Sequence, residues 1–213
     1  RHSTHVVVHT KGETFKGATL VAADGANGPT ARMAGIDARL LHGIALEGNI
    51  TPNGDFPTEW EDMLGLNLGG IPGGYGWMFP KGDHLNIGIG GWKYTAPSLR
   101  GRLGNLAAFY GFEAANMRSL RGHHLPMRGP SGALVNGNVL LVGDAAGLVD
   151  PLTGEGIYSA IWSGRTAARH LALYVAGEVP DLDDYRAEVE RDLVPNLRVA
   201  RQFHDLLHLA PGL

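Results

Sequence analysis

The sequence predicts an α/β fold, α+β overall, in which one layered domain is interrupted by an antiparallel sheet and then resumes. Three observations lead to this prediction. The apolar run at residues 18–23 is typical of a short strand covered on both faces. Short strand candidates separated by turns fill residues 36–95. A buried strand, a tight turn and a long helical pattern then follow one another within residues 137–176.

The composition is that of a globular protein with no signal for nucleic-acid binding. Of 213 residues, 44% are hydrophobic and 18% are charged, which allows a real core. Lys and Arg number 18 against 21 Asp and Glu, so no basic excess favours nucleic acid as a partner. The lack of cysteine excludes disulfides, thiolate metal sites and a cysteine nucleophile. No apolar run approaches the ~20 residues of a membrane-spanning helix, and we expect a cytoplasmic protein.

The first segment predicts two short strands. They are "HVVVHT" at 5–10 and a run within "TFKGATLVAADGANG" at 14–28, joined by the turn "KGE". The second run ends in Asp24-Gly25, which is a loop signal. We assign residues 1–35 to the first part of the layered domain. The chain opens on a strand-like run without an initiator Met, and we expect it to be part of a longer protein.

The middle segment, residues 36–125, predicts an antiparallel sheet domain. Its strand candidates lie at 42–50, 63–70, 76–80 and 84–92, with turns between them that include "TPNGD" at 51–55. Alternation of Leu85, Ile87 and Ile89 predicts one face against a core. Residues 98–112 predict an amphipathic helix, and its expected apolar stripe is Leu99, Leu103, Leu106 and Phe109.

The last segment predicts a return to the layered domain and then a helical tail. Residues 126–178 contain a buried strand, Val139–Val142, and a helix from about Gly156 to Ala176. Residues 179–213 predict one or two amphipathic helices broken near Pro195. In the long helix, the residues spaced to share an apolar face are Ile157, Ile161, Ala168 and Leu171, and those that give it a thin face are Ala160, Gly164 and Ala167.

The stretch "VGDAAGLVDPLTGEGIYSAIWSG" at 142–164 has the pattern of a ligand site. Asp144 closes the buried strand, at the end where open α/β sheets bind ligands. An ionised carboxylate there accepts hydrogen bonds from hydroxyl groups, so a sugar or polyol chain is a natural partner. Residues 154–156 lead into a helix N-terminus, which suits a phosphate or a developing anion. A cap and a glycine turn alone would explain a lone Gly-Asp, but the whole order favours a large anionic ligand.

Four motifs resemble those of one enzyme superfamily. "GNVLLVGDAAGLVDPLTGEGIYSAIWSGRTAA" resembles the second flavin-binding motif of FAD-dependent oxidoreductases related to aromatic hydroxylases, and "LVAADGANG" resembles their Asp-Gly motif. "GGYGWMFPKGDHLNIGIGG" at 73–91 and "GHHLPMRGP" at 122–130 resemble segments of the geranylgeranyl reductases. The resemblance covers most of residues 15–176. It implies a Rossmann-like FAD-binding domain interrupted by a sheet domain for the substrate.

The resemblance also implies roles for the residues of the opening stretch. Asp144 would accept hydrogen bonds from the ribityl chain of FAD. Gly143 and Ala145 would line the approach to the pyrophosphate. The residues beside the pyrimidine edge of the flavin ring would be Gly154, Glu155 and Gly156. The helix dipole there would stabilise the negative charge of the reduced flavin.

Other residues acquire roles only through the resemblance. Asp24 and Gly25 would lie in a loop near the cofactor. The lipid side of the pocket would be lined by Tyr75, Trp77, Phe79 and Pro80, although aromatic residues at alternating positions are also typical of sheet core. The implied reaction is hydride transfer from reduced flavin to a C=C bond of an isoprenoid chain. Its electron donor would be NAD(P)H or ferredoxin, and the tail would allow peripheral membrane contact.

The catalytic acid is not identified by the sequence. Tyr75 and Glu155 are candidates. Nor do the histidines predict a metal site, because His123 and His124 would point to opposite sides of a strand and no H-E-x-x-H spacing occurs.

The sequence also departs from the family patterns. Gly28 stands where Ser is common and Ala31 where hydroxylases often have Arg, which disfavours a hydroxylase more than a reductase. A strand–G-x-G-x-x-G–helix for the ADP half of FAD is missing, so we expect an incomplete FAD-binding domain whose ADP-binding unit lies upstream. Two alternatives stay open: a monooxygenase or halogenase of the same superfamily, and a non-catalytic fragment that holds FAD weakly or not at all.

Overall fold

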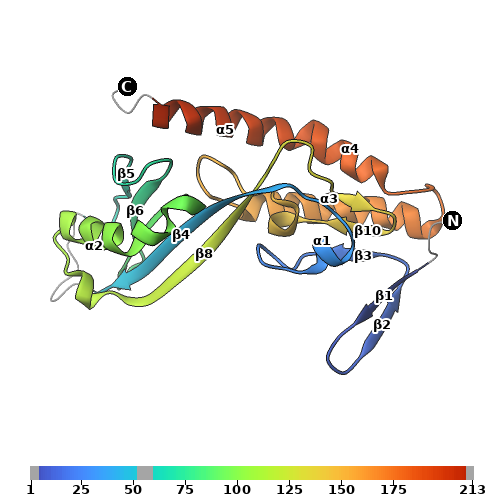
Figure 1. Ribbon diagram of the computed structural model, residues 1–213, viewed down its shortest axis with the longest axis horizontal. Coiled ribbons are helices and arrows are strands. Elements are labelled where there is room, and N and C mark those ends of the chain that lie inside the picture. Colours follow the sequence, from blue (N-terminus) through green and yellow to red (C-terminus); the bar gives the residue numbers. More distant parts are fainter. Residues whose placement is uncertain (1–4, 52–59, 210–213) are drawn as a thin grey trace. The chain divides into compact units, whose positions relative to one another are not determined.

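The computed structural model describes residues 5–51 and 60–209 (Figure 1). The chain divides into two compact units, one of residues 1–41 and 126–203 and the other of residues 42–125 and 204–213. Helices combine with parallel and antiparallel strands, which confirms the predicted α/β class. Apart from Thr51, the turn expected at 51–55 lies outside the described residues.

The first unit contains a hairpin and a three-stranded sheet. Strands β1 (Val6–His9) and β2 (Thr14–Gly17) form the antiparallel hairpin. The sheet has the order β3-β10-β9, from β3 (Leu20–Ala22), β10 (Val139–Leu141) and β9 (Val135–Asn136). β3 runs parallel to β10, so segments far apart in the sequence lie side by side (Figure 1).

Among the described residues, four helices contribute to the first unit, the last of them only up to residue 203. They are α1 (Thr30–Met33), α3 (Ile157–Ala176), α4 (Asp183–Asp192) and α5 (Val194–Leu209), and a 3₁₀ turn, η4, spans Gly143–Ala146. The tail forms two helices separated at Leu193, near Pro195 as predicted, and Pro195 itself lies in the first turn of α5. Proline is tolerated at this position because the N–H groups of the first helical turn have no acceptor within the helix.

The face that α3 buries differs from its apolar face. Ile157 is 73% exposed and Ile161 is 59% exposed. The buried residues of α3 are instead Ser159, Ser163, Thr166 and Ala167. Small side chains let the helix approach the η4 turn closely, which a row of isoleucines would prevent.

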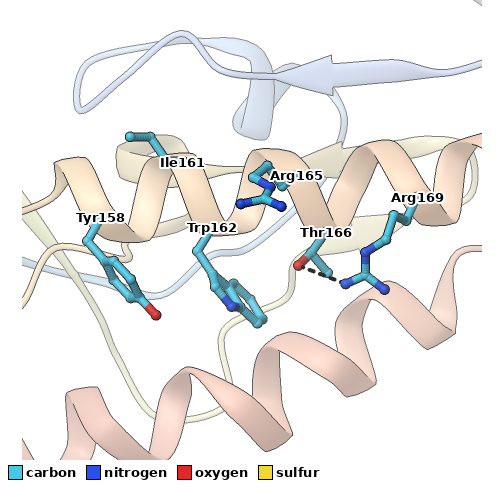
Figure 2. A pocket seen from close by; sticks show the side chains of 6 residues that line it. All are labelled: Tyr158, Ile161, Trp162, Arg165, Thr166 and Arg169. Carbon is cyan, nitrogen blue, oxygen red and sulfur yellow. Dashed lines mark hydrogen bonds between the residues drawn. The ribbon is translucent and has the colours of Figure 1, made fainter.

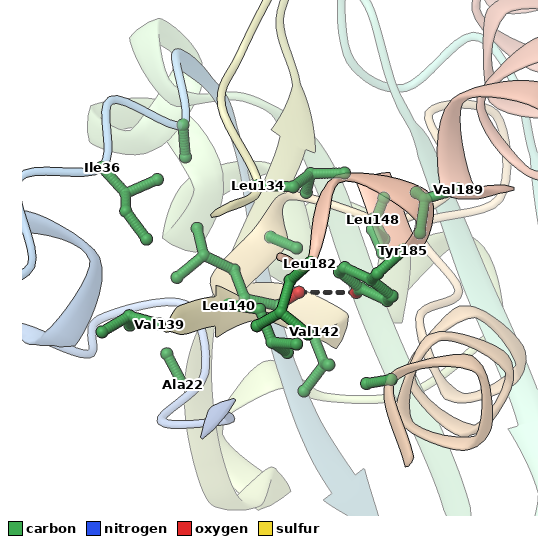
Figure 3. Packing of buried hydrophobic residues seen from close by; sticks show 14 of the residues in the cluster. Ala22, Ile36, Leu134, Val139, Leu140, Val142, Leu148, Leu182, Tyr185 and Val189 are labelled. Carbon is green, nitrogen blue, oxygen red and sulfur yellow. Dashed lines mark hydrogen bonds between the residues drawn. The ribbon is translucent and has the colours of Figure 1, made fainter. Parts of the chain in front are cut away.

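The core of the first unit joins the sheet to α4 (Figure 3). Leu140 and Leu141 of β10 are fully buried, as are Leu182 and Tyr185 at α4. Each such side chain contributes about 1.5–3 kcal/mol by its removal from water. The Tyr185 hydroxyl donates a 2.7 Å hydrogen bond to the carbonyl oxygen of Leu141. This bond fixes α4 against the last residue of β10.

The second unit is a five-stranded sheet with the order β5-β6-β7-β4-β8. Its strands are β4 (Leu40–Ile50), β5 (Gly65–Asn67), β6 (Tyr75–Pro80), β7 (Leu85–Trp92) and β8 (Arg118–Arg128). The 3₁₀ turn η2 (Lys93–Ser98), helix α2 (Leu99–Phe109) and turn η3 (Ala114–Asn116) connect β7 to β8. The unit boundaries fall inside β4, β8 and α5.

The core of the second unit lies between one face of this sheet and α2. Leu85, Ile87 and Ile89 are buried there, which confirms their predicted common face. The leucines of the predicted α2 stripe are buried, but Phe109 is 72% exposed, and its placement in the stripe was wrong. At 100° per residue, Phe109 lies about 80° away from the line of Leu99 and ends the helix.

We predict that Tyr185→Phe destabilises the first unit. Removing the hydroxyl leaves the Leu141 carbonyl buried without its donor, which costs about 1–3 kcal/mol of unfolding free energy. Urea denaturation followed by circular dichroism measures this cost. Tyr94→Phe is the matched control, because Tyr94 is 71% exposed. Equal stability of the two variants would contradict the assigned role of the Tyr185 hydroxyl.

Candidate functional site

Two predicted site residues lie beyond the same edge of the parallel strand pair. Ala22 of β3 is in register with Leu141 of β10, and both strands end at these residues. Asp24 follows two residues later, and Asp144 follows three residues after Leu141. Since the strands are parallel, their carboxyl ends meet at one edge of the sheet. The fold thus brings together two carboxylates that are 120 positions apart in the sequence.

A tight turn presents Asp144. The η4 turn begins at Gly143, with φ +52°, and its C-cap is Gly147, with φ +71°. The Gly143 N–H donates a 3.0 Å hydrogen bond to the buried hydroxyl oxygen of Ser163. A Cβ atom on Gly143 would lie 3.0 Å from the Cβ of Ala160. The absence of a side chain at Gly143 therefore lets α3 pack closely against the η4 turn. Ser163, which accepts the hydrogen bond from Gly143, was not identified by the sequence analysis.

The Asp144 carboxylate is half-buried and has no hydrogen bond or ion pair in the described part of the chain. Burial, and then the negative charge of Glu155, raise the pKa of Asp144 above its ordinary value. A Cβ atom on Gly156 would lie only 2.9 Å from Asp144 Oδ1. Glycine at position 156 thus makes room for the Asp144 carboxylate, an acceptor that the described residues do not satisfy.

The loop between η4 and α3 is held by Asp150. Its Oδ1 accepts hydrogen bonds from the N–H groups of Leu152 and Thr153, both at 2.9 Å. The Thr153 hydroxyl donates to the same oxygen at 3.1 Å. The sequence signal for this loop was the Asp-x-x-Thr spacing, which is typical of such side-chain turns. Asp150 was not among the predicted site residues.

Residues 154–156 lead from this loop into α3. The Gly154 N–H donates to the Asp150 carbonyl oxygen at 2.9 Å, and its φ of +72° favours glycine. The Asp150 N–H in turn donates to the Glu155 carbonyl oxygen at 2.8 Å. Glu155 Oε1 accepts the N–H of Tyr158 at 2.9 Å and so caps α3. Glu155 therefore has a structural role at the helix start.

Asp24 also caps a helix. Its Oδ2 accepts the N–H of Thr30 at 2.9 Å. Burial raises the pKa of Asp24, but hydrogen bonds from Thr30 outweigh it and hold the pKa below its ordinary value. A Cβ atom on Gly28 would lie 2.0 Å from Asp24 Cγ, so glycine at position 28 permits this cap. Gly25, with φ +76°, has open space at its Cα.

The predicted pocket aromatics form a row on one face of the second unit's sheet. Ring centroids of Tyr75 and Trp77 lie 5.9 Å apart, and those of Trp77 and Phe79 lie 6.2 Å apart. Met78, between them, is fully buried in the core on the opposite face. Pro80 takes the register position of that core face, because side chains alternate along a strand.

The Trp77 ring is fixed by contacts that the sequence analysis did not identify. A Cβ atom on Gly88 would lie 2.0 Å from Trp77 Cζ2, so the indole lies over bare backbone. Trp77 Nε1–H donates to Asn86 Oδ1 at 2.8 Å, and Asn86 Nδ2 donates to Asn49 Oδ1 at 3.0 Å. This polar ladder crosses three strands and holds the ring on the face away from the core.

The histidines of β8 form no metal cluster with their neighbours. His123 Nε2 lies 3.1 Å from Glu47 Oε1. Across residues 5–51 and 60–209, no group of three or more His, Asp or Glu side chains is arranged to hold a metal ion.

Comparison with known proteins identifies the relatives of this chain. No protein-family profile matches it. A chloroplastic geranylgeranyl diphosphate reductase of Oryza sativa subsp. japonica is 32% identical over 194 residues, covering 87% of this chain and 42% of the relative. A digeranylgeranylglycerophospholipid reductase of Methanocella arvoryzae is 34% identical over 202 residues, covering 86% and 48%. A menaquinone reductase of Mycolicibacterium smegmatis is 33% identical over 191 residues, covering 82% and 45%.

This chain is a homologue of the geranylgeranyl reductases. The resemblance inferred from its motifs is confirmed. The chain spans about half the length of the curated relatives that it matches.

Solved structures share the fold of this geranylgeranyl reductase homologue. A geranylgeranyl bacteriochlorophyll reductase-like protein of Thermoplasma acidophilum superposes with a TM-score of 0.76 at 24% identity, covering 95% of this chain and 57% of that one. CmlS, a flavin-dependent halogenase, superposes with a TM-score of 0.56 at 18% identity, covering 94% and 38%. At these identities the superpositions show the fold alone. Among the described residues of the homologue, every helix is too short or too polar to cross a membrane.

We predict that Asp144→Asn stabilises the cofactor-free protein at neutral pH. The pKa of Asp144 is raised on folding, so the stability that its protonated form contributes is full below the ordinary pKa and is lost as the pH rises through the raised one. Asn is uncharged at every pH and avoids that loss. Thermal melts should show a higher Tm for the variant at about pH 7, and equal values near pH 3, below the ordinary pKa of about 3.9.

The control for this experiment is Asp62→Asn, which changes an exposed carboxylate and should leave the Tm unchanged at both pH values. A variant at position 144 that is less stable than the wild type at neutral pH would mean that Asp144 has a partner within the protein.

Proposed function

We propose that this chain is part of an FAD-dependent oxidoreductase that reduces C=C bonds of an isoprenoid lipid. The observation that carries the proposal is the half-buried Asp144 carboxylate, which has no partner in the described part of the chain. It lies at the carboxyl end of β10, the usual ligand edge of such sheets. The reductases among the relatives are named for geranylgeranyl lipids or menaquinone, which supports an isoprenoid substrate.

The residues around Asp144 fit the polyol chain of FAD. An ionised carboxylate is an acceptor only, and hydroxyl groups are donors that it can use in place of water. Such donors would offset the burial that raises the pKa of Asp144. Glycine at position 156 makes room for the Asp144 carboxylate at the start of α3. The unsatisfied acceptor therefore favours a bound polyol.

The neighbouring residues would hold the rest of the cofactor. Gly143 and Ala145 of the η4 turn would face the pyrophosphate, and residues 154–156 would approach the flavin ring with the start of α3 behind them. The N-terminal end of this 20-residue helix carries a partial positive charge, which favours the anionic reduced ring. Asp24 would act indirectly, by shaping through its cap the loop in which Gly25 stays open.

The sheet of the second unit would bind the lipid. FAD, when reduced, supplies the hydride in this chemistry. The protein's task is to orient an apolar chain and exclude water, and the row of Tyr75, Trp77 and Phe79 offers an aromatic surface for it. Pro80, on the other face by register, would affect the pocket only through the end of β6.

Tyr75 and Glu155 are the two candidates for the proton donor, and Glu155 accepts the N–H of Tyr158. We further propose a cytoplasmic location with NAD(P)H or ferredoxin as electron donor. Contact with the membrane surface would use the exposed apolar side of α5, which carries Val199, Phe203, Leu206 and Leu207.

We predict that Asp144→Ala weakens flavin binding by tenfold or more in the full-length protein. Hydrogen bonds to a charged acceptor contribute about 1.5–3 kcal/mol, and 1.4 kcal/mol is a factor of ten. Gly156→Ala should also weaken binding, because its Cβ would push against Asp144 Oδ1. Gly164→Ala, where a Cβ has open space, is the matched control. The measurement is flavin absorbance retained after gel filtration.

Two outcomes would overturn the assignment of the cofactor site. Unchanged flavin content in the Asp144→Ala protein would remove Asp144 from the site. A wild-type protein that takes up no flavin would favour the alternative of a non-catalytic chain.

We predict reduction of a geranylgeranyl lipid by the dithionite-reduced protein without oxygen. Mass spectrometry should find product heavier by two hydrogen atoms for each bond reduced. The alternative is a flavin-dependent halogenase or monooxygenase, which the structural similarity to CmlS keeps open. Turnover that requires oxygen would favour that alternative and contradict the reductase.

A further inference from the structure

A pocket of about 300 Å³ runs along α3, but its walls hold no good acid for the proposed reduction (Figure 2). Reduction of a C=C bond needs a proton as well as a hydride, and a general acid must release its proton readily near neutral pH. An arginine side chain does not release its proton in proteins, and a phenol is a weak acid. The residues that line this pocket are Tyr158, Ile161, Trp162, Arg165, Thr166 and Arg169.

The second unit offers an acid on the sheet face that carries Tyr75, Trp77 and Phe79, which we call the outer face. Residues directly opposite each other in neighbouring strands lie on the same face. Trp77 is in register with Gly88, and Gly88 is in register with Glu47. Glu47 of β4 therefore lies on the outer face, one strand spacing of about 4.8 Å beyond Gly88. The Trp77 indole lies over Gly88 and so extends toward the strand of Glu47.

Glu47 pairs with His123 of β8, the strand next to β4 in the sheet (Figure 1). His123 Nε2 lies 3.1 Å from Glu47 Oε1, which places the imidazole on the outer face as well. The other ring nitrogen, Nδ1, has no hydrogen bond within residues 5–51 and 60–209. The side chain of His123 is 48% exposed, and that of Glu47 is 28% exposed. A carboxylate thus faces one nitrogen of the ring, and the second nitrogen is left for a ligand.

The outer face offers few other acids. In the described strands β4 to β8, its titratable or cationic side chains are Glu47, Tyr75, Arg121 and His123. Near neutral pH a carboxyl group is ordinarily ionised already, whereas phenol and guanidinium groups keep their protons. Imidazolium is the group of this set that both holds a proton and releases it there. The chemistry of the face therefore singles out its histidine.

We propose that His123 is the proton donor of the proposed C=C reduction and that Glu47 is its positioning residue. The proposal rests on the proposed function and adds a third acid to the two candidates named above. The Nε2–H of the imidazolium donates to Glu47 Oε1, which fixes the ring and balances its charge. The Nδ1–H then faces an isoprenoid chain that lies on the outer face.

The step conserves atoms and electrons. The π bond of the alkene breaks, and one carbon gains the hydride that the reduced cofactor supplies. The π electron pair forms the second C–H bond with the Nδ1 proton at the other carbon. The lipid is thereby reduced and the flavin oxidised. His123 becomes a neutral imidazole whose Nε2–H stays on Glu47, and solvent returns the proton because the side chain is half-exposed.

The test is anaerobic reduction of a geranylgeranyl lipid by the full-length, flavin-loaded protein, reduced beforehand with dithionite. His123→Gln should slow a single turnover about 100-fold, because a general acid contributes about 10²–10⁴-fold. Glu47→Gln should slow it about tenfold, since the amide still accepts the Nε2–H but carries no charge. The matched control is His124→Gln, which changes the next residue of β8, on the other face, and should keep the wild-type rate.

Two further measurements separate proton donation from a structural role. Lipid binding to the oxidised protein, followed by tryptophan fluorescence, should be the same in His123→Gln and wild type, because the lost interaction acts only in the transition state. Imidazole added to the buffer should restore part of the rate of His123→Ala, because it can occupy the space of the missing ring and donate the proton.

Three outcomes would overturn the assignment of His123 alone, provided that the wild type reduces the lipid. They are a wild-type rate in His123→Gln, a larger loss of rate in Tyr75→Phe than in His123→Gln, and a loss in His123→Ala that added imidazole does not relieve. A wild-type protein that binds flavin but reduces no lipid would overturn the proposed function, and the assignment of the acid with it.

Discussion

The parallel pairing of β3 with β10 is the constraint on which the candidate site depends. It places Ala22 beside Leu141, and only through this register do Asp24 and Asp144 leave the sheet at one edge. The pairing extends beyond the strands, because the Val142 N–H donates to the Ala22 carbonyl oxygen at 3.1 Å. Fully buried leucines of β10 and the Tyr185 hydroxyl then hold the strand in place. Strand β10 therefore contributes both to the core of the first unit and to the sheet edge at which Asp144 lies.

Around that edge, most polar groups are satisfied by the protein and one is not. Asp24 caps α1, Asp150 closes its loop and Glu155 caps α3. Asp144 alone among these four carboxylates has no partner in the described part of the chain, although burial raises its pKa. A fold that satisfies three acceptors and leaves the fourth half-buried has a cost in stability at that position, which is typical of a binding site.

The glycines show how a correct motif can carry more than one role. The resemblance assigns Gly143, Gly25 and Gly156 to the cofactor. In the structure, the missing side chain of Gly143 makes room for Ala160 and that of Gly156 makes room for the Asp144 carboxylate, whereas Gly25 leaves space that the described residues do not fill. Gly28, which departs from the family pattern, permits the cap by Asp24. A glycine in the sequence indicates a position where a side chain is not tolerated, but it does not identify the neighbouring group that excludes the side chain.

The sequence by itself determined the α/β class, the strand that delivers Asp144, the common face of Leu85, Ile87 and Ile89, and the family relationship. These follow from periodicity and motif order, which are local properties of the chain. Tertiary structure alone decided that α3 buries its serines rather than Ile157 and Ile161, and that Asn86 and Asn49 hold Trp77. It also decided that Asp144 stays unpartnered among the described residues. Such contacts join segments distant in the sequence, and no local period records which of them meet.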